Sequence, residues 1–214
     1  MSPSIALLLS IAAILVLLRL KMHPGPAVFL GGLALSLLFI KPHLAYLFLV
    51  AALWRGLSER RWRAFIGLAL GVLVPSAAVA LLRPTIFVDY LTAMLGSPPM
   101  YWRTATLGQW LRIAFGWDRY WLQFAPTLVT LPAFALWLYR RRDEPWHWPV
   151  RAPQLLLVSV VTSAYGWTYD QVILLPAVMA IVACAPHLAP LRRALIVSGL
   201  GASQVALMAM PHLQ

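Results

Sequence analysis

Long apolar runs, separated by short segments rich in arginine, dominate this chain. The runs at 4–18, 64–82 and 172–185 contain no charged residue, and a helix of about 20 apolar residues crosses the hydrocarbon core of a membrane. Of the 214 residues, 62% are hydrophobic and 11% are charged, whereas soluble domains average about 25% charged residues. A soluble domain could not bury that much apolar surface. We therefore predict an all-α integral membrane protein.

The spacing of the runs predicts a single transmembrane helix bundle that covers residues 1–214. The first run has no basic residue before it and has Arg19 and Lys21 directly after it, the reverse of the charge order in a cleavable signal peptide. We interpret it as an uncleaved span with its N-terminus outside. About eight spans are expected, at 4–18, 27–40, 44–57, 64–82, 120–138, 154–168, 172–185 and 194–210.

The basic residues are distributed unequally between alternate connections. Short loops with an excess of lysine and arginine stay on the cytoplasmic side, and dispersed basic clusters of this kind do not form the single basic face of a nucleic-acid-binding protein. We therefore predict that both termini are extracytoplasmic and that nucleic acid is not a partner. The twelve inside residues would be Arg19, Lys21, Arg55, Arg60, Arg61, Arg63, Arg140, Arg141, Arg142, Arg151, Arg192 and Arg193, and the five outside residues Lys41, Arg83, Arg103, Arg112 and Arg119.

The connection at 83–119 is the one long polar and aromatic loop, and its pattern predicts two helices lying in the membrane surface. In 86–95 the apolar residues recur at helical spacing opposite Asp89. A second helix is expected to begin at Thr106, with Thr106 and Gln109 forming a capping box. Gly116 is expected to end it.

Two polar motifs interrupt the apolar runs on the predicted extracytoplasmic side. Lys41-Pro42-His43 stops one run and starts the next, and 165–171 joins the sixth span to the seventh. Asp170, one of only six acidic residues, is costly at the edge of a span unless it is solvated, paired or used in function. The simpler alternatives are that this turn faces water and that Lys41 snorkels from the end of a span.

Several function classes lack support in the residues. The five histidines form no His-x-x-x-His pair, no glycine-rich nucleotide loop is present, and Cys184 is the single cysteine. No cofactor or metal site is therefore evident, although a divalent cation is left open. Gly67 and Gly71 have the spacing that lets two helices approach closely, but chance gives the same spacing in a span rich in glycine and alanine.

Three stretches resemble the C-terminal half of the family 87 membrane glycosyltransferases, which are bacterial multi-span enzymes of the GT-C class that use polyprenyl-phosphate sugars. The similarity runs from about 27 to 185. Family members are about twice as long, and their catalytic base lies in an N-terminal half that has no counterpart here. The chain is then expected to be a fragment, a subunit of a split enzyme, or a shortened relative. The stretches are Phe39 to His43, Arg60 to Ala64, and Ser163 to Val172 with Leu174-Leu175-Pro176.

The resemblance implies transfer of a hexose from a polyprenyl-phosphate sugar on the extracytoplasmic side of a bacterial plasma (inner) membrane. Basic residues would neutralise the lipid phosphate, and a carboxylate would take the proton of the acceptor hydroxyl. Asp170 and Asp89 are the candidate bases on that side. The candidate substrate-binding residues are Lys41, His43, Arg83, Arg103, Tyr165, Trp167, Tyr169 and Gln171.

Two other classes of function are compatible with the sequence. A non-catalytic membrane scaffold or lipid-binding subunit would partner a separate chain that supplies the N-terminal half. A transporter fits less well, because transporters place ionisable groups near the middle of the bilayer, whereas those of this chain lie at the ends of the runs. Membrane lipid is a partner in each case.

Overall fold

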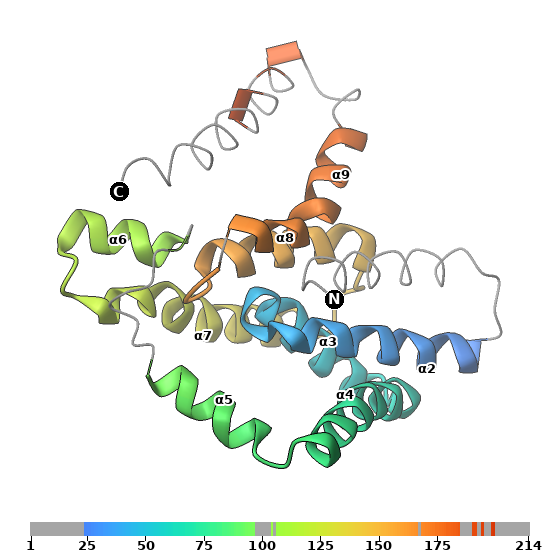
Figure 1. Ribbon diagram of the computed structural model, residues 1–214. Helices are drawn as coiled ribbons and strands as arrows, with labels where there is room; N and C mark the ends of the chain where they lie inside the picture. Colours follow the sequence, from blue (N-terminus) through green and yellow to red (C-terminus); the bar gives the residue numbers. More distant parts are fainter. Residues whose placement is uncertain are drawn as a thin grey trace.

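The computed structural model describes residues 24–96, 104, 106–166 and 168–184, with 190, 191, 194, 198 and 199. Every regular element in these residues is a helix (Figure 1), as predicted. The expected first span and almost all of the eighth lie outside the described residues. The elements in chain order are α2 (Pro24–Leu35), η1 (Ser36–Ile40), η2 (Pro42–Leu44), α3 (Tyr46–Ser58), α4 (Trp62–Leu82), α5 (Ile86–Leu95), α6 (Leu107–Phe115), η4 (Tyr120–Gln123), α7 (Ala125–Arg140), α8 (Trp148–Thr162), η5 (Thr168–Leu174) and α9 (Leu175–Cys184).

The helix α3 is the centre of the buried core, with two faces that pack against different neighbours. Leu47 and Ala51, one helical turn apart, contact α7 and α8. Ala45 and Leu49 belong to a second buried cluster with Val160 of α8. Aliphatic and aromatic side chains make up both clusters, so apolar packing holds α3, α7 and α8 together.

The helices α2 and α4 pack through small residues. A Cβ atom on Gly32 would overlap the backbone of Ala64, and one on Gly67 would overlap the carbonyl oxygen of Phe29. A Cβ atom on Gly71 would overlap the hydroxyl of Ser36 in the same interface. The Gly67–Gly71 spacing is therefore used for close helix approach and is not a chance feature.

Two of the described helices are long and apolar enough to cross a membrane. They are Trp62–Leu82, of which 6% of the apolar window is buried, and Tyr120–Arg140, with 28% buried. A core helix of a soluble protein would be mostly buried. Large apolar side chains such as Leu73, Leu82 and Leu128 instead point outward, and an exposed apolar surface of this extent favours a lipid environment.

The two helices predicted in the 83–119 loop are present as α5 and α6. Gly116 ends α6 with φ of 131°, a conformation that favours glycine. The expected capping box is wrong, although Thr106 is the residue preceding the helix, because its hydroxyl makes no capping bond. The Gln109 side chain instead accepts a hydrogen bond from the backbone N–H of Thr104.

The predicted sixth span is displaced by six residues at each end. The helix α8 runs over Trp148–Thr162 instead of 154–168. Proline lacks a backbone N–H but is tolerated in the first turn of a helix, which accounts for Pro149. Pro153, where the connector was expected to end, lies inside α8. Much of the polar stretch after α8 is then folded as the 3₁₀ helix η5, which leads into α9.

Candidate functional site

The Lys41 and Asp170 motifs meet in a partly buried ion pair. Lys41 lies between η1 and η2, Asp170 lies in η5, and the Lys41 Nζ and Asp170 Oδ1 atoms are 2.6 Å apart. The Asp170 side chain is 5% exposed and that of Lys41 24% exposed. Asp170 is therefore neither solvated at a water-facing turn nor alone, and Lys41 does not simply snorkel from a span end.

His43 and Tyr165 make a second contact between the same two motifs. Their rings stack with centroids 3.8 Å apart and planes inclined by 28°. His43 Nε2 is buried without a hydrogen-bond partner in the described part of the chain. His43 lies in the connection between two predicted spans, where burial lowers its pKa to about 4, with Asp170 opposing this shift and Lys41 adding to it. The imidazole is therefore neutral at pH 7.

The His43 environment predicts a loss of stability in mild acid. Since the folded-state pKa is below the ordinary value of 6.5, the unfolded chain binds more protons between about pH 6.5 and 4. We expect the folded state to have its full His43 contribution above pH 6.5 and to lose it as the pH falls towards 4. Thermal unfolding in detergent across this range should show a shallower acid decline for His43→Phe than for the wild type. Parallel declines would contradict the prediction.

A buried polar network joins the loop helix α6 to the same region. The Gln123 side chain, fully buried, donates from Nε2 to the Ala164 carbonyl at 2.6 Å and to Thr104 Oγ1 at 2.9 Å. Arg112, 1% exposed, donates to Gln123 Oε1 at 3.3 Å. The Ala164 carbonyl directly precedes Tyr165, so the second half of the loop contacts the stretch that bears the stacked ring.

Gln123, Arg112, Thr104 and Thr106 were not among the candidate residues, although the sequence carries a signal for them. The apolar residues Leu107, Trp110 and Phe115 of α6 are exposed, whereas Gln109 and Arg112 are buried. The α6 helix is thus amphipathic with its polar face inward. Its apolar stripe was predicted to face the membrane, which implies that the opposite face meets polar groups of the protein.

Other predicted site residues are not brought into this contact network. Arg83 and Asp89 form an exposed ion pair at 2.8 Å, and Thr85 donates to Asp89 at 3.0 Å. Asp89 lies in the first turn of α5, where a carboxylate stabilises the helix. Arg103 and Trp167 lie outside the described residues. Tyr169 and Gln171 lie in η5.

Hydrogen bonds between different helices and connections occur at two opposite ends of the bundle. At the end with Lys41, Tyr46 of α3 shares a 2.8 Å hydrogen bond with Thr162 of α8, and Thr127 of α7 donates to the Thr162 carbonyl. At the opposite end, Arg55 of α3 donates to the carbonyls of Arg142 and Glu144. Segments predicted to share a side of the membrane are thus in contact with one another.

Comparison with family models, curated proteins and solved structures finds no match to this chain. Within the described residues, no group of three histidine, cysteine, aspartate or glutamate side chains could hold a metal ion. The features of this site that bear on function are therefore the charged pair, the stacked rings and the buried network around them.

Proposed function

We propose that this chain is an integral membrane glycosyltransferase, or part of one, that transfers a hexose from a polyprenyl-phosphate sugar on the extracytoplasmic side. The observation that carries the proposal is the direct contact between the Lys-Pro-His and Tyr-Asp-Gln motifs, which supply the resemblance to family 87. A scaffold whose motifs served only as membrane anchors would not require these side chains to pair in a buried place.

In the proposed reaction Lys41 neutralises the lipid phosphate, and its pairing with Asp170 holds the ammonium group in position. The His43–Tyr165 stack supplies an aromatic surface beside the ion pair. Arg83 contributes only if the donor displaces its pairing with Asp89.

Asp170 is better suited to positioning than to proton abstraction. Its carboxylate is held by Lys41 and is 5% exposed, whereas a general base must reach the hydroxyl that it deprotonates. We therefore propose that the base comes from a separate chain corresponding to the N-terminal half of the family 87 enzymes.

The membrane arrangement in this proposal has about eight spans, both termini extracytoplasmic, and α5 and α6 in the membrane surface. It is supported by the charge asymmetry of the loops and by the two polar ends of the bundle. The bacterial plasma membrane is the proposed location, because polyprenyl-phosphate sugars are the implied donors.

The proposal predicts that the purified chain binds a polyprenyl-phosphate hexose but transfers the sugar only when the partner half is supplied. Asp170→Asn, which preserves the shape of the side chain, is expected to lower transfer by roughly tenfold or more, since the ammonium group of Lys41 loses its position. Donor binding and transfer would be measured in lipid nanodiscs with a radiolabelled sugar. Thr92→Ala, on an exposed face of α5, is the control.

Two results would reject this function. If the wild-type chain does not bind the donor, or if Asp170→Asn binds and transfers as the wild type does, the pair has no role in transfer. The buried Lys41–Asp170 contact would then be a structural link, and the scaffold or lipid-binding subunit becomes the function. The observation that favours a scaffold or lipid-binding subunit is that the Asp170 side chain is only 5% exposed.

A further inference from the structure

A cluster of arginine and tryptophan side chains lies at the end of the bundle opposite Lys41. Arg55 and Arg151 stand over the ring of Trp146, with the guanidinium carbon 5.1 and 5.9 Å from its centroid. Arg151 also stands over Trp137, at 5.2 Å, and Trp146 packs edge-on against Trp148. The cluster joins α3, α7, α8 and the connection between α7 and α8.

Two hydrogen-bond donors in this cluster are buried without an acceptor. Arg55 Nε and Trp146 Nε1 have no hydrogen-bond partner among the described residues. Both groups are donors only, so whatever satisfies them must supply an acceptor oxygen. Neither Arg55 nor Arg151 has a carboxylate within salt-bridge distance in the described part of the chain. An anionic acceptor therefore fits the cluster better than a neutral one.

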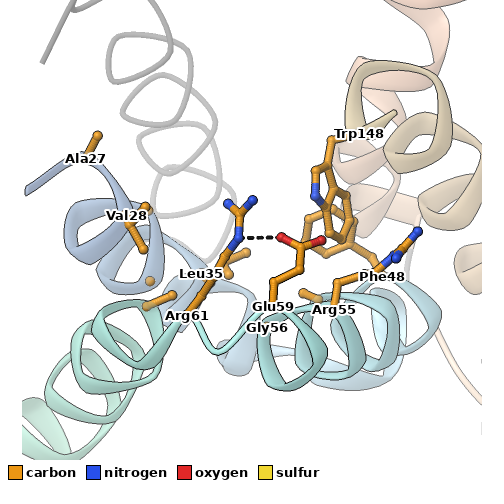
Figure 2. Close-up of a pocket in the computed structure, with 13 residues that line it drawn as sticks. Ala27, Val28, Leu35, Phe48, Arg55, Gly56, Glu59, Arg61 and Trp148 are labelled. Carbon is orange, nitrogen blue, oxygen red and sulfur yellow. Dashed lines mark ion pairs between the residues drawn. The ribbon is translucent and has the colours of Figure 1, made fainter. Parts of the chain in front are cut away.

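A cavity of about 490 Å³ is lined by Arg55 and Trp148 of this cluster and continues between α2 and α3. Trp146 stands behind it, in contact with both of these side chains. Figure 2 shows Trp148 and the Arg61–Glu59 ion pair facing this space. Its walls are otherwise aliphatic or aromatic, and a Cβ atom built on Gly31 would meet nothing within 4 Å. The cavity therefore has a mainly apolar lining that can accept apolar groups, and its charged lining residues are Arg55 and the Arg61–Glu59 ion pair.

We propose that this cluster and cavity bind one anionic phospholipid of the surrounding bilayer. The headgroup phosphate accepts hydrogen bonds from Arg55 and Trp146, and an acyl chain lies between α2 and α3 beside Gly31. Basic pockets between transmembrane helices are suited to such headgroups because charge and hydrogen bonding act together. The site goes beyond the proposed transferase function, since it lies at the opposite end of α3.

The test measures lipid binding by the full chain in uncharged detergent, by native mass spectrometry with titrated phosphatidylglycerol or phosphatidylcholine. We expect phosphatidylglycerol to bind about tenfold more tightly or better, and Arg55→Gln to remove about tenfold of that affinity, as expected for hydrogen bonds to a charged group. Trp146→Phe, which keeps the ring but loses the N–H, should weaken binding severalfold. Gly31→Leu should weaken binding by filling the cavity.

Arg63→Gln is the matched control, because it removes the same charge from an exposed side chain nearby. It should bind phosphatidylglycerol as the wild type does. Equal affinity for the two lipids would overturn the proposal. Equal losses of phosphatidylglycerol affinity in the Arg63 and Arg55 variants would also overturn it, because they would mean that the lipid responds to the overall surface charge. If inorganic phosphate competes as well as the lipid does, the site binds free anions and not a phospholipid. Should Arg55→Gln fail to fold, wild-type affinity of Trp146→Phe for phosphatidylglycerol would by itself overturn the proposal.

Discussion

Replacing Lys41 with alanine is expected to lower the free energy of unfolding by up to about 3–5 kcal/mol, the range found when one partner of a buried ion pair is removed. The reason is that the carboxylate of Asp170 would stay in a place where it is 5% exposed without its ammonium partner. Unfolding of the purified chain in detergent, followed by circular dichroism against temperature or denaturant, measures this loss.

Two further variants separate burial from simple charge pairing. Replacing both members, Lys41→Met with Asp170→Leu, should recover most of the stability, because no unpaired charge remains and apolar groups can fill the space. Breaking the exposed ion pair with Arg83→Ala should cost no more than about 1 kcal/mol. A loss for Lys41→Ala as small as that for Arg83→Ala would show that the Asp170 carboxylate is not sequestered from solvent.

Replacing Gly32 with alanine is expected to cost about 1–3 kcal/mol or more, as overpacking of a close interface does. The new Cβ atom would overlap the backbone of Ala64, and backbone atoms move only if α2 and α4 separate. The neighbouring Gly31→Ala is the control, because its Cβ atom meets nothing within 4 Å and alanine favours a helix by up to about 1 kcal/mol.

Thermal unfolding of these two glycine variants gives opposite expected shifts from the same chemical change. Equal shifts in the same direction would mean that α2 and α4 do not approach at Gly32. The comparison is internal to one helix, so detergent effects act on both variants alike.

The helices that could be predicted are those specified by the residues of the helix itself. The bounds of α4 and α5 agree with expectation to within two residues, because a charge-free run or a helical apolar stripe specifies each. The α8 helix was misplaced because Pro149 and Pro153 suggest a connector, whereas α8 has the first in its first turn, which accepts proline, and the second in its interior. Local composition alone does not distinguish these two uses of proline.

Long-range pairing was only partly accessible from the sequence. Loop charges predict that Lys41 and Asp170 share one side of the membrane, but nothing in the residues specified contact between positions separated by 129 in the chain. The Gln123 network was missed for the same reason. A single glutamine near the end of an apolar run is equally compatible with a headgroup-facing position, and its partner Ala164 contributes only a backbone oxygen.

The bond from Gln123 to the Ala164 carbonyl also has a consequence for biogenesis. The loop helix α6 precedes its partner in the chain, because residue 164 is synthesised well after α6 has left the ribosome. The bonds among Arg112, Gln123 and Thr104 lie within the part made first and can form before α8 is complete. We expect only the bond to the Ala164 carbonyl to wait for α8, so the loop folds on itself first and is fastened to the rest of the bundle afterwards.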